Sequence, residues 1–180
     1  MTTLQAIQSD DNIILTGFMG TGKSSVGRLL AERLGYTFVD TDDVIAHRCG
    51  RAVHEIFRRE GEEAFRAREA ALARELAAGK RQVIATGGRL MLDADNAAVL
   101  SRHGRVFCLW ASAEEIMARV AADTAAVRPL LAGPDPESRI RALYAERREG
   151  YARFTPIMTS GQTVSEVVQA VCERLAVAQE

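Results

Sequence analysis

A glycine-rich stretch, GFMGTGKSS, has the clearest chemical pattern in the sequence and occupies residues 17–25. It has the form G-x-x-x-x-G-K-[S/T], in which glycines let backbone N–H groups close around phosphate oxygens. Lys23 would reach the β- and γ-phosphates of a nucleotide, and Ser24 would hold Mg²⁺. The alternative is a glycine-rich turn that precedes a helix. The residues predicted to contact a nucleoside triphosphate are Gly20, Thr21, Gly22, Lys23, Ser24 and Ser25.

Two carboxylates, Asp40 and Asp42, follow a predicted strand at residues 37–39. They could serve Mg²⁺ or a substrate hydroxyl, because a phosphoryl acceptor needs a group that orients its hydroxyl and takes its proton. The alternative is that Asp40 or Thr41 caps the helix that follows.

Three arginines lie in segments where a guanidinium could bind an anion. Arg66 lies in EGEEAFRAREA, Arg128 begins RPLLAGPDP, and Arg147 lies near the end of a predicted helix. A planar guanidinium binds carboxylates in a bidentate manner, and an arginine on a lid can stabilise a transferring phosphoryl group. The alternatives are an i,i+4 pair with Glu62 for Arg66, a solvated loop for Arg128, and a favourable helix-dipole contact for Arg147.

Paired glycines, Gly87 and Gly88, follow the predicted strand at residues 82–85. Glycines at the end of a strand let backbone N–H groups approach a ligand, although a plain turn would use the same residues.

Strands and helices alternate along the chain that carries these residues. Strands are predicted at residues 12–16, 37–39, 82–85, 105–110 and 155–159. Helices are predicted at residues 23–34, 42–49, 53–78 with a bend near Gly61, 94–101, 113–121, 137–149 and 164–178. Ser112 and Glu115 have the spacing of a capping box. Alternation of this kind predicts an α/β fold with a parallel sheet covered on both faces, and ligands bind such sheets at the carboxyl ends of the strands.

Length and composition indicate one globular domain, residues 1–180, with a loose leader at 1–10 and a lid at about 123–137. The net charge of −1 gives no sign of a nucleic-acid or membrane partner. No stretch is long and apolar enough for a membrane span, and the first residues lack the pattern of a signal peptide. Three widely spaced cysteines fit no disulfide framework or CxxC site, so we expect a cytoplasmic protein.

From about Asn12 to its end, the chain resembles the shikimate kinase family. The matching segments are GFMGTGKSSVGRLLAERLG, FVDTDDVI, EIFRREGEEAFRARE, VIATGG, RPLLAG and the AER of YAERREGY, in the family's order and spacing. The resemblance implies a three-layer α/β/α P-loop fold with a five-stranded parallel sheet. It also implies a monomer that transfers the γ-phosphoryl group of ATP to the 3-hydroxyl of shikimate, a step of aromatic amino acid biosynthesis, with Mg²⁺ as cofactor.

The resemblance also implies roles for single residues. Asp42 would bind the ring hydroxyls of shikimate and orient the nucleophile, and Asp40 would support Mg²⁺ through water. Arg66 and Arg147 would bind the shikimate carboxylate. The substrate-binding set is therefore Asp42, Arg66, Gly87, Gly88 and Arg147.

On the nucleotide side, the resemblance makes Arg128 the lid arginine that acts on ATP, with Arg119 and Gln162 near the adenine. The catalytic set is therefore Lys23, Asp42 and Arg128.

Two positions depart from the family pattern. Arg89 stands where the family has a third glycine, so it would be strained if that position needs a positive φ. It could also narrow the substrate site or add to anion binding. Glu149-Gly150 replaces a Pro-Leu pair and could change how the helix ends and where Arg147 points. These departures keep two alternatives open: a kinase with another hydroxylated anionic acceptor, and a ligand sensor that transfers nothing.

Overall fold

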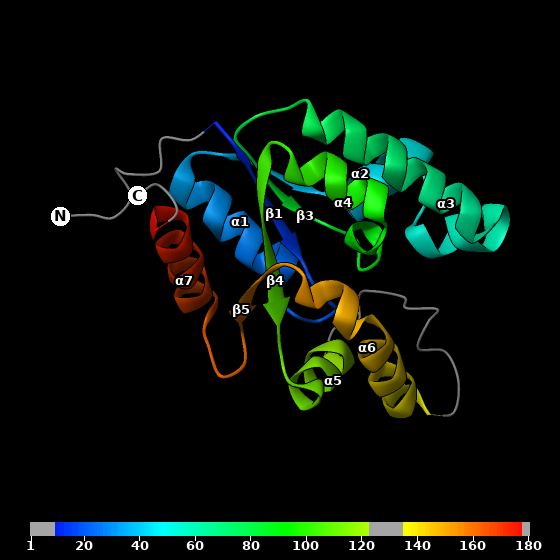
Figure 1. Ribbon diagram of the computed structural model, residues 1–180. Helices are drawn as coiled ribbons and strands as arrows, with labels where there is room; N and C mark the ends of the chain where they lie inside the picture. The colour runs from blue at the N-terminus through cyan, green and yellow to red at the C-terminus, as the bar shows by residue number, and fades with distance from the viewer. Residues whose placement is uncertain (1–9, 123–134, 178–180) are drawn as a thin grey trace.

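The computed structural model describes residues 10–122 and 135–177, which form a parallel five-stranded sheet between layers of helices (Figure 1). The strands are β1 (Asn12–Thr16), β2 (Thr37–Asp40), β3 (Gln82–Ala85), β4 (Gly104–Trp110) and β5 (Thr155–Met158). The helices are α1 (Lys23–Leu34), α2 (Thr41–Cys49), α3 (Val53–Ala77), α4 (Ala94–Ser101), α5 (Ala113–Ala122), α6 (Pro136–Ala152) and α7 (Val164–Val177), with a short 3₁₀ helix η2 (Leu90–Leu92). The predicted fold class is confirmed.

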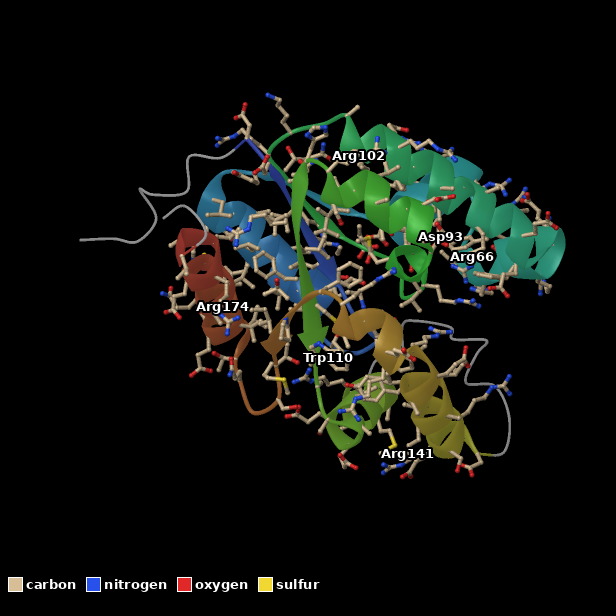
Figure 2. The ribbon with its side chains drawn as sticks, viewed as in Figure 1. Arg66, Asp93, Arg102, Trp110, Arg141 and Arg174 are labelled. Carbon is tan, nitrogen blue, oxygen red and sulfur yellow. The ribbon has the colours of Figure 1, made fainter. Side chains whose placement is uncertain are left out.

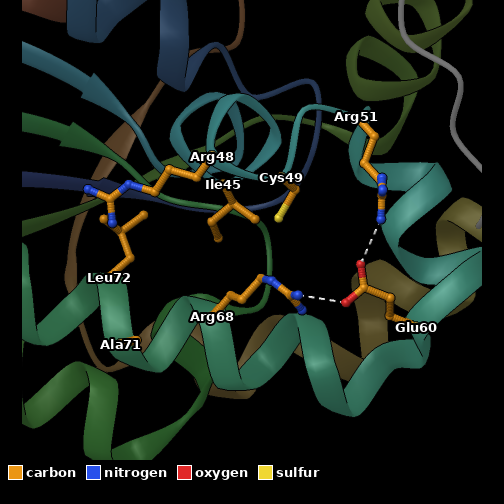
Figure 3. A pocket seen from close by; sticks show the side chains of 8 residues that line it. All are labelled: Ile45, Arg48, Cys49, Arg51, Glu60, Arg68, Ala71 and Leu72. Atoms are coloured by element: carbon orange, nitrogen blue, oxygen red, sulfur yellow. Dashed lines mark hydrogen bonds and ion pairs between the residues drawn. The ribbon is translucent and has the colours of Figure 1, made fainter.

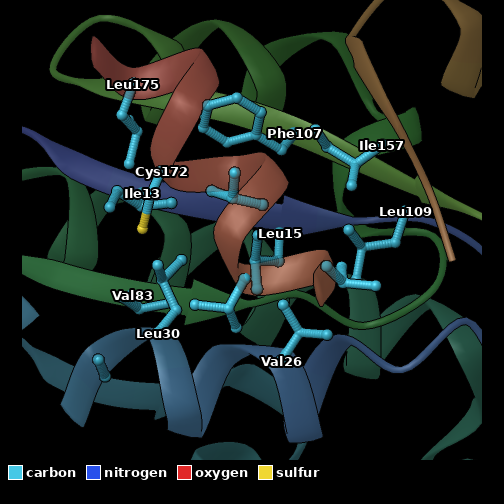
Figure 4. Close-up of a cluster of buried hydrophobic side chains, with 14 residues drawn as sticks. Ile13, Leu15, Val26, Leu30, Val83, Phe107, Leu109, Ile157, Cys172 and Leu175 are labelled. Carbon is cyan, nitrogen blue, oxygen red and sulfur yellow. The ribbon is translucent and has the colours of Figure 1, made fainter. Parts of the chain in front are cut away.

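Strand β1 lies at the centre of the sheet, whose order is β2-β3-β1-β4-β5. It pairs in parallel with β3 on one side and β4 on the other, and all five of its residues are buried. Because side chains alternate along a strand, Ile13 and Leu15 face one layer of helices and Ile14 faces the other. The first face packs on α1 and α7 (Figure 4), and the second on α3 and α4.

Glycines end two helices and interrupt a third, as the predicted bend near Gly61 requires. Gly35 and Gly50 end α1 and α2 with φ of 66° and 62°, in the left-handed region that favours glycine. Gly61 interrupts α3 with φ 85° and ψ 172°. The predicted bounds of β1, α1, β3 and α4 match the structure to the residue.

The predicted end of α6 at residue 149 is wrong, because the helix continues through Glu149-Gly150 to Ala152. Gly150 does not end the helix. A Cβ there would lie 2.7 Å from Leu92 Cδ2, so glycine makes room for η2 to pack against α6. The idea that Arg147 complements a helix end is therefore also wrong, since α6 has no basic residue in its last turn.

The predicted capping box at α5 is only half correct. Ser112 Oγ accepts a hydrogen bond from Glu115 N–H at 3.2 Å, as an N-cap does. The Glu115 carboxylate instead accepts from Gly161 N–H at 2.8 Å, and Ser112 N–H donates to Ser160 Oγ. The start of α5 is thus tied to the turn after β5.

The predicted leader and lid, including Arg128, lie outside the described residues, apart from Asp10 and residues 135–137 at the start of α6. Across the described ranges, no helix combines the length and the apolar character needed to cross a membrane.

Gly17, the residue after β1, is the described glycine at which an added Cβ would come nearest to a backbone atom. Its φ is 130°, and a Cβ would overlap the carbonyl oxygen of Leu109 in β4. We expect Gly17→Ala to lower the free energy of unfolding in urea by about 3 kcal/mol, because it combines backbone strain with a clash against a fixed backbone.

Gly35→Ala is the matched control. Its φ is also positive, but nothing lies within 4 Å of a Cβ there, so the loss should be only about 1 kcal/mol. Equal losses in the two variants would show that the contact with Leu109 contributes nothing.

Candidate active site

The loop between β1 and α1 has the geometry of a phosphate-binding loop. Gly22 caps α1 in a left-handed conformation, with φ 94°, and the exposed Ser24 and Ser25 begin the helix. Lys23 Nζ donates to the carbonyl oxygens of Gly17 at 2.9 Å and Phe18 at 2.8 Å. The ammonium group therefore lies across the loop, where the positive end of the helix dipole adds to its charge.

Asp40 both caps α2 and faces the phosphate-binding loop. Its Oδ1 accepts from the N–H of Asp42 at 3.1 Å and of Asp43 at 3.5 Å. Its Oδ2 accepts from Ser24 Oγ at 2.7 Å. The capping alternative is thus confirmed without excluding the role at a metal.

Oxygen atoms from a hydroxyl and a carboxylate suit Mg²⁺, so the Ser24–Asp40 pair fits that ion. The described part of the chain has no group of three or more His, Cys, Asp or Glu side chains that could hold a metal. The remaining ligands of an ion here would therefore be phosphate oxygens and water.

Asp42 lies at the start of α2 against the loop after β3. A Cβ at Gly87 would lie 2.5 Å from Asp42 Oδ1 and 3.0 Å from Glu69 Oε1, so glycine is what allows both carboxylates to approach this loop. Thr41, the neighbour of Asp42, accepts from Gly87 N–H at 2.8 Å and fixes the same contact. Desolvation, together with the charge of Asp40, raises the pKa of Asp42 to about 6, while Lys23 and Arg66 oppose the rise.

Glu69 is a member of the site that the sequence reasoning missed. Its side chain is only 1% exposed, and it pairs with Arg66 Nη1 at i,i+3 spacing on α3. Burial raises the pKa of Glu69 to about 7, although the charge of Arg66 and its hydrogen bond lower it. The spacing of Arg66 and Glu69 was a usable signal, but the sequence offered Glu62 as an equally good partner.

The predicted pair of Arg66 and Glu62 is also present. Glu62 Oε1 accepts from Arg66 Nε at 3.2 Å and Nη2 at 3.1 Å. Arg66 is not simply solvated, because two thirds of its side chain is covered and its guanidinium lies near the rings of Phe57 and Phe65. Figure 2 labels it on α3.

Arg147 approaches the same loop from α6. It is 7% exposed, its Nε has no hydrogen-bond partner, and its guanidinium lies 5.7 Å from the centre of the Phe18 ring. A Cβ at Gly88 would lie 3.7 Å from Arg147 Nη1. Burying a cation is costly, so this position suits an anionic ligand.

Tyr151, one turn after Arg147, fixes α6 to this loop. Its hydroxyl donates to the carbonyl oxygen of Gly88, and its ring meets Trp110 edge-on with centroids 6.3 Å apart. Trp110 ends β4, as Figure 2 shows.

Arg89 is not strained, because its φ is −115° and its ψ is −11°. The condition for strain, a positive φ at this position, is therefore not met. Its side chain is about half exposed, and Nη1 donates to Glu62 Oε1 at 2.9 Å.

Arg119, predicted near the adenine, contacts the phosphate-binding loop, and Gln162, with the same prediction, lies in the turn after β5. Arg119 donates to the carbonyl oxygen of Gly20 at 3.3 Å and to both the hydroxyl and the carbonyl of Thr159 at 3.1 Å. Gln162 is exposed in the turn after β5, where its N–H donates to Thr159 O. Their contact with adenine stays a prediction.

A separate pocket of about 360 Å³ lies between α2 and α3 (Figure 3). Glu60 lines one side of this pocket, where its carboxylate pairs with Arg51 and Arg68. None of the predicted site residues lines it, so it is not part of the site at the carboxyl ends of the strands.

Comparisons with known proteins agree with this geometry. The family model described as "Shikimate kinase" matches residues 19–176. A shikimate kinase from Symbiobacterium thermophilum is 48% identical, over 91% of this chain and 95% of its own length, and one from Geobacter metallireducens is 43% identical, over 94% of each. The solved structure of shikimate kinase from Acinetobacter baumannii in complex with shikimate superposes with a TM-score of 0.88, at 35% identity and 98% coverage of both chains.

Glu69 should make stability depend on pH. Because its folded pKa is about 7 against an ordinary value of 4.5, the native state binds the proton more tightly, and stability falls as pH rises through this interval. Glu69→Gln removes the titration. Between pH 5 and pH 8, the free energy of unfolding of the wild type should fall by about 2 kcal/mol more than that of the variant. Urea unfolding at the two pH values measures this difference.

Glu63→Gln is the control, because Glu63 is exposed on the same helix. A pH dependence that is the same in all three proteins would contradict the assignment to Glu69.

Proposed function

This chain belongs to the shikimate kinase family and is an ATP-dependent kinase, and we propose how its residues transfer the γ-phosphoryl group of ATP to the 3-hydroxyl of shikimate. One observation carries the proposal. Asp42 lies against Gly87, where the charges of both Lys23 and Arg66 act on its carboxylate. The group that would receive the acceptor's proton is thus between the phosphate-binding loop and an arginine suited to the acceptor's carboxylate.

Asp42 acts as the residue that binds the hydroxyls and takes the proton. With a pKa of about 6 it is mainly ionised at neutral pH, yet more basic than an ordinary aspartate. Those properties suit a general base that must accept a proton from a hydroxyl as the phosphorus–oxygen bond forms. The backbone of Gly87 and Gly88 completes this side of the acceptor site.

Arg66 and Arg147 bind the carboxylate of shikimate. The bonds from Arg66 to Glu62 and Glu69 use one N–H on each of its three nitrogens. One N–H therefore remains on Nη1 and one on Nη2, and these are donors that a carboxylate could use. Arg147 supplies a second, buried cation from α6.

The nucleotide binds through the backbone of Gly20, Thr21 and Gly22 and the side chains of Lys23, Ser24 and Ser25. Ser24 and Asp40 would hold Mg²⁺, Asp40 through water, and the ion would neutralise charge on the phosphate oxygens when bound. Lys23 then stabilises the charge that develops on the transferred group.

The remaining assignments rest on the family resemblance. Arg128, outside the described residues, acts on the transferring phosphoryl group from the lid, and Arg119 and Gln162 lie toward the adenine. A cytoplasmic monomer stays a prediction.

An ADP-release assay with ATP, Mg²⁺ and shikimate tests the proposal. We expect shikimate-dependent turnover that falls at least about 100-fold in Asp42→Asn, because the amide cannot take the proton. Asp43→Asn is the matched control, since Asp43 pairs with Arg28 on the exposed side of α2 and should leave turnover unchanged. Turnover of a different acceptor, or none with shikimate, would contradict the proposal.

The pH dependence of kcat/KM for shikimate tests the role of Asp42 as base. Since its pKa in the free enzyme is about 6, kcat/KM should be nearly constant above pH 7 and fall about tenfold per unit well below pH 6. Circular dichroism at pH 5 checks that the protein stays folded. A profile that is flat from pH 5 to pH 8 would rule out Asp42 as the group that must be ionised.

A further inference from the structure

One carboxylate oxygen joins two arginines at the edge of the site. Glu62 Oε1 accepts from Arg66 Nε and Nη2, and also from Arg89 Nη1 at 2.9 Å. Glu62 follows the break in α3 at Gly61, whereas Arg89 follows Gly87-Gly88, so the bridge crosses from α3 to the loop after β3.

Without Arg89, the surroundings of Arg66 would be dominated by negative charge. Its guanidinium touches two carboxylates, Glu62 on one edge and Glu69 at Nη1. Glu69 is partly protonated near neutral pH, because burial raises its pKa to about 7, but Glu62 is half exposed. A fully charged Glu62 would cancel the cation that must attract the acceptor's carboxylate.

Arg89 supplies the balancing charge. It adds one positive charge at the same oxygen, so the trio of Arg66, Glu62 and Arg89 has a net charge of +1 instead of zero. The charge of Arg89 also acts on the more deeply buried Glu69. Burial raises the pKa of Glu69, Arg66 lowers it, and the charge of Arg89 lowers it more weakly.

We propose that Arg89 is a positioning residue that sets affinity for the acceptor's carboxylate, by pairing with Glu62 so that Arg66 keeps a net positive charge. This inference rests on the proposed function, since it concerns the acceptor that Arg66 binds. It makes no claim on the chemical step, because Arg89 acts through Glu62 and Arg66.

A role in folding alone would predict something different. The Arg89–Glu62 pair is about half exposed on both sides, and pairs of this kind contribute little to stability. The backbone of Arg89 is relaxed, so replacing it relieves no strain. Its removal should therefore change binding of an anion much more than it changes unfolding.

The test removes the charges at these two positions singly and together, and measures ADP release. Arg89→Ala should raise KM for shikimate about threefold to tenfold, with kcat within about twofold and KM for ATP unchanged, because one charge near the carboxylate is lost. The double variant Glu62→Gln/Arg89→Ala should return KM to within about twofold of wild type, because the charge that Arg89 balanced is gone. Arg89→Lys should stay near wild type.

Two controls separate this effect from a general loss of positive charge. Arg58→Ala removes an exposed arginine that pairs with Glu55 on the same helix, and should leave KM unchanged. The rise in KM for Arg89→Ala should also shrink in 0.5 M NaCl, since salt screens exposed charges.

Calorimetric titration of shikimate without nucleotide distinguishes failure of this inference from failure of the proposed function. Two outcomes overturn the inference alone, provided that the wild type turns over shikimate. In the first, Arg89→Ala has the same KM for shikimate as the wild type. In the second, its KM is raised but adding Glu62→Gln does not restore it. Binding that weakens in Arg89→Ala without any wild-type turnover overturns the proposed function alone. A wild-type protein that neither binds nor phosphorylates shikimate overturns both.

Discussion

The backbone of β1 needs hydrogen-bond partners on both sides, and this need organises the molecule. All five residues of β1 are buried, so their N–H and C=O groups cannot be satisfied by water. Strands β3 and β4 supply the partners, and both run parallel to β1. The carboxyl ends of the strands therefore meet at one edge of the sheet, which brings the phosphate-binding loop beside Gly87 and Gly88. Segments that are about 70 residues apart in the chain thus form one site.

At that edge the structure keeps several ionisable groups close together in partial burial. Asp42 and Glu69 approach the same glycine, and Arg66 and Arg147 bring positive charge from two helices on different sides. Each buried charge carries a desolvation cost that the others only partly offset. The arrangement costs stability in the free protein, but it holds a carboxylate of raised pKa beside cations. An anionic, hydroxylated ligand would interact with the carboxylate and with the cations. Groups that are costly to bury in the free protein would therefore gain partners in the complex.

Much of this architecture could be predicted from the sequence. The bounds of β3 follow from its short apolar run. The ends of β1 and α1 follow from Gly17 and Gly35, because glycine readily takes the positive φ found there. The phosphate-binding loop could be placed for the same reason. The Arg66–Glu62 pair was foreseen, but the burial of Glu69 was not, because several glutamates and arginines lie at helical spacing in this segment. Which glutamate turns inward depends on the packing of α3 against the sheet, not on local spacing.

Other errors also arise from contacts between distant segments. Glu115 has the spacing of a capping box, yet it binds Gly161, which is near only in the folded chain. Gly150 lies inside α6 and not at its end, and the side chain of Leu92 fills the space beside it. The backbone of Arg89 depends on the start of η2, which no pattern indicated. In each case the local preference was weak, and a tertiary contact decided the outcome.

The edge-on contact of Trp110 with Tyr151 gives this protein an intrinsic optical reporter. Trp110 is the only tryptophan in the chain, and it lies where β4 reaches the site. Tyr151, whose ring contacts Trp110, also donates a hydrogen bond to the carbonyl oxygen of Gly88. Arg147 lies one turn earlier on the same helix. A shift of α6 relative to the sheet would therefore change the surroundings of a single indole. Its emission follows events at the site without any attached label.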